Sequence, residues 1–110
     1  MTTAAVLVAL ADPTRRRLVE LLAAQGARTA TALAAELPVT RQAVVQHLAV
    51  LREAGVVDSL KSGREVRFGL LPRALTEAAS WMEQVAAQWD HRLAAIKQLA
   101  EQLPDVSGRP

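Results

Sequence analysis

The sequence predicts a mostly α-helical domain that carries one small β-hairpin, and three observations support this fold class. Half of the 110 residues (51%) are hydrophobic and only 3% are aromatic, and the abundance of Ala and Leu favours helix. Apolar side chains recur at helical spacing over most of the chain. In residues 56–71 the spacing changes to alternation, where Val66, Phe68 and Leu70 are separated by polar residues or glycine.

Length and composition exclude several classes of protein. A chain of 110 residues with 22% charged residues is long enough for one folded domain and too apolar to be disordered. It has no cysteine, which excludes disulfides and thiolate chemistry. The apolar run 4–11 is too short to span a membrane, and no basic residue precedes it as in a signal peptide. We therefore expect a soluble, cytoplasmic protein.

Positive charge gathers in the middle of the sequence. Residues 12–67 contain nine Lys or Arg against six Asp or Glu, whereas residues 72–110 contain four against five. A basic segment is what a surface for polyanions requires. The net charge is only +2, so charge alone does not decide the function.

The first two helices are expected over residues 3–10 and 13–24. Asp12 is a suitable N-cap for the second helix, and Pro13 suits its first position. Gly26 should end it. The side chains that should face inward from this helix are Leu18, Leu21 and Leu22.

Two further short helices follow in quick succession. Either Thr29 or Thr31 can cap a helix over residues 31–37, which Pro38 should stop. Thr40 can then cap the next helix. Two short helices joined by a tight turn form a helix-turn-helix pattern.

The alternating segment predicts a hairpin, and a long helix follows it. Ser62-Gly63 should form the turn, with Lys61 and Arg64 beside its tip. Helix is expected to resume after Pro72 and to continue through residues 73–103, because no strong helix breaker interrupts this stretch. Residues 104–110 are expected to form a flexible tail.

Together these elements describe a winged helix-turn-helix domain over residues 1–103, in which residues 12–70 form the DNA-binding part. Three stretches resemble the ArsR-type bacterial repressors, and they read ADPTRRRLVELL, TRQAVVQHLAVLREAGVV and SGREVRFGL. The stretch WMEQVAAQWDHRL is similar to the final helix of one branch, which is often encoded beside START-like lipid-binding-fold proteins. The resemblance implies a homodimer that binds a palindromic operator in double-stranded DNA and represses transcription.

The helix after Thr40 has an unusual polar face, with Gln42, Gln46 and His47 in place of the usual mixture of Glu and Lys. An amide can pair with adenine, and a histidine can donate to guanine. Ala43 is small enough to let the helix enter a groove. The expected DNA-binding residues are Thr40, Arg41, Gln42, Ala43, Gln46, His47, Lys61, Arg64 and Arg67.

Two positions depart from the family pattern. The place of Val45 is often serine in the family, and that of Gln46 is often Lys or Arg. Both differences remove a polar or charged contact, so we expect lower affinity or a different operator.

Apolar residues form a broad stripe on the final helix. One small domain cannot cover so long a helix, and large apolar surfaces are rarely left bare. We therefore expect a homodimer interface made by the helices at residues 3–10 and 73–103, in which Leu103 belongs to the stripe and Val6 also takes part. Its expected residues are Leu7, Leu10, Trp81, Val85, Trp89, Leu93 and Ile96.

Three alternatives bear on the function. Adjacent Asp90 and His91 point about 100° apart on a helix, so we expect no metal site and no cofactor. An organic effector near the tryptophans, or no effector, remains open. We expect no enzyme, because no nucleophile–base pair or phosphate-binding glycine loop is present. The rival to DNA binding is a winged helix used for protein–protein contact.

Overall fold

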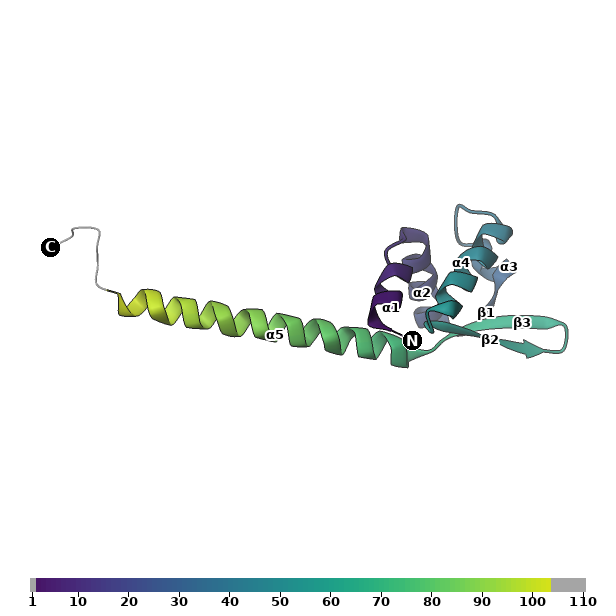
Figure 1. Cartoon of the computed structure of the whole chain (residues 1–110). Coiled ribbons are helices and arrows are strands. Elements are labelled where there is room, and N and C mark those ends of the chain that lie inside the picture. The colour runs from purple at the N-terminus through teal and green to yellow at the C-terminus, as the bar shows by residue number, and fades with distance from the viewer. Residues whose placement is uncertain (1, 104–110) are drawn as a thin grey trace. The chain divides into compact units, whose positions relative to one another are not determined.

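The computed structural model describes residues 2–103, and it confirms a mostly helical fold with a small β-sheet (Figure 1). The expected tail at residues 104–110 lies outside the described residues. Contacts divide the chain into a first unit up to Ala78 and a second unit from Ala79 onward. The elements are α1 (Thr3–Ala9), α2 (Pro13–Gln25), β1 (Arg28–Thr29), α3 (Ala30–Ala34), α4 (Arg41–Glu53), β2 (Val57–Ser62), β3 (Glu65–Leu70) and α5 (Pro72–Gln102).

The helices of the first unit begin at side chains that cap them. The Asp12 carboxylate accepts a hydrogen bond from the backbone N–H of Arg15 at 3.0 Å, and the Thr40 hydroxyl accepts one from the N–H of Ala43 at 3.1 Å. Each cap satisfies one of the N–H groups that a helix start leaves without a partner. Both predicted caps are confirmed.

Helix α3 is shorter than predicted and begins earlier. Its N-cap is Thr29, whose hydroxyl accepts from the N–H of Ala32 at 3.1 Å. It ends at Ala34, four residues before Pro38, so the proline does not stop it. After Ala34 the backbone continues in tighter turns with hydrogen bonds between residues three positions apart. In one of them the Leu37 N–H donates to the Ala34 carbonyl at 3.3 Å.

The sheet has three strands, whereas the sequence predicted only a hairpin. Strand β1 pairs antiparallel with β3, and the order is β1-β3-β2. Ser62 pairs with Glu65, so the turn residues are Gly63-Arg64 instead of Ser62-Gly63. Gly63 has φ of +60°, which a glycine at the first turn position adopts without strain.

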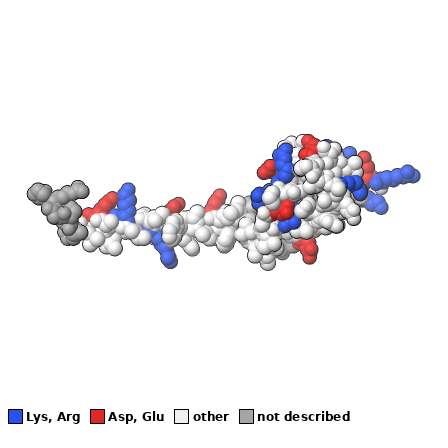
Figure 2. All heavy atoms as spheres, turned by 90° about the horizontal axis from the view of Figure 1, so that it is seen from above, with Lys and Arg blue, Asp and Glu red and all other residues white. Residues whose placement is uncertain are grey.

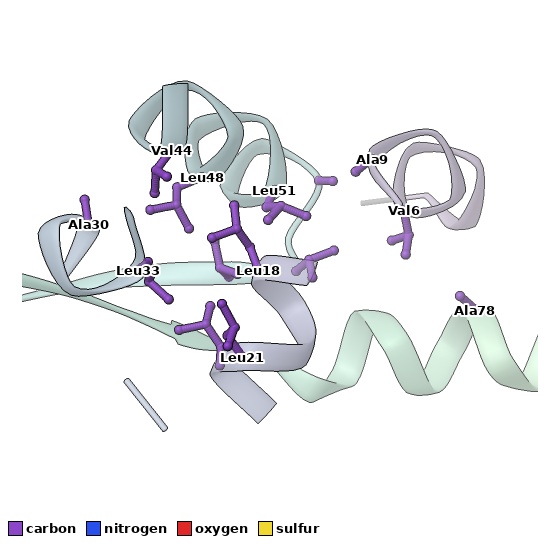
Figure 3. Close-up of a cluster of buried hydrophobic side chains, with 14 residues drawn as sticks. Val6, Ala9, Leu18, Leu21, Ala30, Leu33, Val44, Leu48, Leu51 and Ala78 are labelled. Carbon is purple, nitrogen blue, oxygen red and sulfur yellow. The ribbon is translucent and has the colours of Figure 1, made fainter. Parts of the chain in front are cut away.

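The core of the first unit lies between α2, α3 and α4 (Figure 3). The inner face of α4 points at α2, as the helical spacing predicted, and α1 closes one side of the cluster. Burying this face against a packed core fixes the direction in which the outer face of α4 points. The residues that carry this packing are Leu18, Leu21, Leu33, Val44, Leu48 and Leu51, all at most 4% exposed.

Helix α5 is continuous over 31 residues. Its first turns belong to the first unit, where Ala78 is buried and Ala74 and Leu75 pack against the core. From residue 79 to 103 every side chain is exposed in the single chain. Within the described residues, none of the helices combines the length and apolar character needed to cross a membrane.

Candidate nucleic-acid interface

The outer face of α4 presents amides to solvent. Gln42 and Gln46 are exposed, and Ala43 between them is half-buried. Val44 and Leu48 anchor the opposite face in the core at 0% exposure. The helix therefore offers a fixed row of groups that both donate and accept hydrogen bonds.

The start of α4 is braced against α3. The Arg41 Nε donates to the Thr31 hydroxyl at 3.1 Å. A groove of about 600 Å³ opens beside this contact, and Arg64 of the hairpin turn contributes to its wall. Two guanidinium groups, a threonine hydroxyl and a helix N-terminus suit a phosphate group. Glu65 also lines this groove, and its carboxylate is paired with Arg67.

The hairpin carries three cations, but they are not equivalent. The Arg67 Nη2 lies 3.0 Å from the Glu65 carboxylate, so part of its charge is neutralised. Among the residues that the structure describes, no ion pair involves Lys61 or Arg64. Lys and Arg atoms project from the end of the first unit at which the hairpin tip lies (Figure 2). Lys61 and Arg64 are thus the cations of the hairpin best placed to meet a polyanion.

His47 does not lie on the open face with the two glutamines. Its ring is half-buried, and its Nδ1 lies 3.3 Å from Nη1 of Arg15 on α2. On a helical wheel His47 is about 100° from Leu48, which places it at the edge of the polar face. The neighbouring helix α2 contacts that edge, so His47 is less exposed than the two glutamines with which the sequence analysis grouped it.

Arg15 and Arg16 connect α2 to the end of α1, whereas Arg17 pairs with Glu20 on its own helix. Arg15 Nε donates to the Ala9 carbonyl at 2.6 Å, and Arg16 Nη1 donates to the Leu10 and Ala11 carbonyls at 2.9 and 3.0 Å. These carbonyls lie at the C-terminal end of α1, where cations are favoured.

Two carboxylates of the first unit have lowered pKa values. The backbone N–H groups of Arg15 and, to a smaller extent, Thr14 donate to the Asp12 carboxylate and hold its pKa below the ordinary value. Hydrogen bonds from the Gln25 and Arg28 side chains lower the pKa of Glu36. Arg28 also forms an ion pair with Glu36.

The expected dimer residues of α1 differ in their exposure. Leu10 packs against the core of its own chain, Val6 is only 2% exposed and Leu7 is half-buried. The large apolar side chain that α1 exposes is Val8, at 69%, and the sequence analysis did not include it. A helical wheel of α1 alone did not show which side would meet α4.

On α5 the expected stripe is exposed, with Trp89 at 60% and Ile96 at 62%. Trp81, Val85 and Leu93 are exposed in the same way. The sequence analysis did not include Met82 and Leu99, which also belong to the exposed apolar stripe. A search for a seven-residue period would have found both. The apolar positions that follow this period are Met82, Val85, Trp89, Ile96, Leu99 and Leu103, and Arg92 interrupts it.

Residues 2–103 contain no group of three or more His, Asp or Glu side chains close enough to hold a metal ion. His91 is exposed on α5. The polar groups of the candidate interface are therefore amides, hydroxyls and cations from α4 and the hairpin.

A helix-turn-helix followed by a basic hairpin defines the winged helix-turn-helix class of DNA-binding regulators. A family model described as a helix-turn-helix domain matches residues 10–59. The HTH-type transcriptional regulator Rv2034 of Mycobacterium tuberculosis is 38% identical over 93 residues, which are 84% of this chain and 83% of that protein.

Solved structures agree with this assignment. An ArsR-like transcriptional regulator from Rhodococcus sp. RHA1 is 44% identical, with a TM-score of 0.80 over 92% of this chain and 94% of that one. The homodimeric winged helix-turn-helix domain of Mb0332 from Mycobacterium bovis is 27% identical, with a TM-score of 0.62 over 77% of each chain. The chain belongs to the ArsR-type family of winged helix-turn-helix transcriptional regulators. It is a DNA-binding regulator of transcription.

Proposed function

We propose that this protein is a homodimeric repressor that reads a palindromic operator with α4 and holds the DNA backbone with its β2–β3 hairpin. The observation that carries this proposal is the exposed pair Gln42 and Gln46 on a helix whose other face is locked in the core. Such a face has hydrogen-bonding groups at fixed positions, which base reading requires.

The chemistry of the two glutamines suits the major groove. An amide can donate to N7 and accept from N6 of adenine only if its oxygen and nitrogen are turned the right way, and a glutamine side chain can rotate to achieve this. Half-buried Ala43 lies between them and leaves space for a base edge or a thymine methyl group. We therefore assign the reading of bases to this face of α4.

Contacts to phosphates should come from the groups around it. Arg41 and Arg64 line one groove, and Thr40 lies at the helix start. Lys61 is exposed on the hairpin. These groups carry charge or hydroxyls, which suit phosphate oxygens, so we assign to them the role of fixing register and orientation.

The exposed apolar residues of α5 support the homodimer. Trp89 and Ile96 are both more than half exposed, and a single chain gains free energy when such surface is buried in a symmetric interface. The related domain of Mb0332 is homodimeric. A dimer with two recognition helices matches two half-sites related by a two-fold axis, which is a palindrome.

Repression follows from occupancy, because a dimer bound over a promoter excludes the polymerase. Such a regulator works on the chromosome, so we place it in the cytoplasm. The rival function is a winged helix that contacts another protein. A binding titration distinguishes the repressor from this rival. In it the protein is added to labelled DNA from upstream of its own gene, and fluorescence anisotropy reports the binding.

Repressor function predicts saturable binding that a scrambled duplex of equal length does not reproduce, and affinity that falls steeply with salt. Equal affinity for both duplexes at every salt concentration would contradict the proposal and favour the protein-binding rival.

A further inference from the structure

Arg15 occupies a half-buried position at which three helices meet. Its Nε donates to the carbonyl of Ala9 on α1 at 2.6 Å, and its Nη1 lies 3.3 Å from His47 Nδ1 on α4. Its own backbone N–H is bound by the Asp12 cap. The guanidinium is thus held at one edge by a carbonyl while the other edge meets the imidazole.

The direction of the contact between Arg15 and His47 follows from chemistry. A guanidinium has only N–H donors and stays protonated in proteins. A hydrogen bond to it therefore needs a lone pair on His47 Nδ1. A neutral imidazole with a lone pair on Nδ1 carries its hydrogen on Nε2.

We propose that Arg15 is a positioning residue that fixes His47 as the Nε2–H tautomer, so that position 47 of the recognition helix offers a hydrogen-bond donor to the operator. This inference rests on the proposed sequence-specific binding of DNA. In the major groove guanine presents two acceptors, N7 and O6, whereas cytosine presents a donor. His47 should therefore select a guanine in each half-site and reject cytosine at that strand position.

The hydrogen bond from Arg15, which we call the tautomer lock, also explains how a half-buried histidine can distinguish between bases. A free imidazole interchanges its two tautomers, so it would present a donor or an acceptor at the same place. A charged neighbour that only donates removes one of these states. The ring then has one fixed hydrogen-bonding character, and the contact discriminates between bases.

The first measurement is the tautomer itself. Imidazole ¹⁵N spectra of the whole protein at neutral pH should show His47 with its hydrogen on Nε2, whereas exposed His91 on α5 serves as the internal control with both tautomers populated. In Arg15→Met the His47 signals should move toward those of His91. Arg17→Met removes the same charge from the same helix and should leave the His47 signals unchanged.

The second measurement compares two substitutions of His47 on an operator that carries every single-base change. His47→Asn keeps an acceptor near Nδ1 for Arg15 and lacks the distal donor, so discrimination at one base pair per half-site should fall by about 5- to 100-fold. His47→Gln keeps a distal amide, and its preference at that base pair should change from guanine to adenine. Circular dichroism should show both variants folded.

The outcomes separate this inference from the proposed function. A hydrogen on His47 Nδ1, or signals that match those of His91, would overturn the tautomer lock whatever the DNA results. Full discrimination by His47→Asn would overturn the reading role while the proposed function stands. A wild type without any base preference would overturn the proposed function, and the ¹⁵N spectrum would still decide the lock. If Arg15→Met does not fold, the wild-type spectrum and the two His47 variants decide.

Discussion

Arg41, the first residue of the recognition helix, is tied to α3 through a hydrogen bond of 3.1 Å from its Nε to the Thr31 hydroxyl. This contact leaves the terminal nitrogens of the guanidinium available to a phosphate in the groove beside it. A residue that holds a phosphate should influence affinity but not base choice.

Arg41→Ala should therefore lower affinity for all operator variants by a similar factor and flatten the slope of log affinity against log salt by about one unit. Thr31→Val removes the hydrogen bond to Arg41 but keeps the Arg41 charge. Its salt slope should therefore stay at the wild-type value, and its affinity should fall less than that of Arg41→Ala. Anisotropy titrations at four salt concentrations measure both. A change in the order of preferred bases for Arg41→Ala would show that Arg41 reads bases directly.

The hairpin offers a comparison between two cations on one element. Arg64→Ala should reduce the salt slope by about one unit, because Arg64 has no ion pair among the described residues. Arg67→Ala should reduce it less, since the Glu65 carboxylate already lies 3.0 Å from Arg67. Glu65→Ala is the matched control, and by releasing Arg67 it should raise the affinity. If the slope of log affinity against log salt were the same for Arg64→Ala and the wild type, Arg64 of the hairpin would not contact the DNA.

Much of the first unit could be predicted because its signals are local. Asp12 and Thr40 cap helices through bonds to residues only three positions away. The spacing of Val44 and Leu48 identified the buried face of α4 from its own sequence. Capping residues and buried helix faces can be recognised from residues that lie within a few turns of the same helix, so they can be predicted from the sequence.

The features that were missed depend on partners far away along the chain. Strand β1 is two residues long and exists because Thr29 pairs with Arg67, so it shows no alternation of its own. His47 was assigned to the open face because a helical wheel ignores neighbouring helices, whereas Arg15 of α2 covers that side. Tertiary contacts of this type carry no periodic signal.

Asp12 makes the stability of the domain depend on pH in a defined direction. Its pKa is lowered in the folded state, first by the N–H of Arg15, so its ionised form stabilises the fold. This contribution is fully present above the ordinary pKa of an aspartate and is lost as the pH falls through the lower folded pKa.

Asn can cap a helix without ionising. Asp12→Asn should therefore keep most of the thermal stability at pH 7 and lose less of it than the wild type on acidification. Melting curves from pH 7 to pH 2.5 test this. An identical pH dependence in both proteins would mean that other carboxylates, such as Glu36, dominate the acid transition.

The exposed stripe of α5 predicts how the dimer can be broken. Trp89→Glu combined with Leu93→Glu places two charges on side chains that are 60% and 47% exposed in the single chain. We expect a monomer at micromolar concentration by analytical ultracentrifugation, with a folded first unit and affinity for the full operator lowered by at least tenfold, since two half-sites are no longer bound together.

The matched control adds the same two charges to polar positions of the same helix. On a helical wheel Gln84 and Gln98 lie on the side of α5 opposite to the apolar stripe, so Gln84→Glu with Gln98→Glu should remain a dimer. A monomeric wild type, or a dimer that survives Trp89→Glu with Leu93→Glu, would place the interface elsewhere.

Gln42 and Gln46 carry the central prediction, which is that exposed amides of α4 choose the bases. Removing a base contact costs about 1–3 kcal/mol at one base pair and relaxes preference there, whereas losing a phosphate contact weakens all sequences alike. Gln42→Ala and Gln46→Ala should each change the order of preferred bases at one position, symmetrically in both half-sites. Because both side chains are exposed, neither substitution should alter the melting temperature by more than about 2 °C.

A complete set of single-base operator variants, titrated with each protein, measures this. Glu53→Ala, on the last turn of the same helix, is the control for a general effect of truncating α4 side chains, and its order of preferred bases should equal that of the wild type. If both glutamine variants also keep the wild-type order, then Gln42 and Gln46 only help to position the protein. Base choice would then lie with His47 of the same helix, with Arg41 or with the cations of the hairpin.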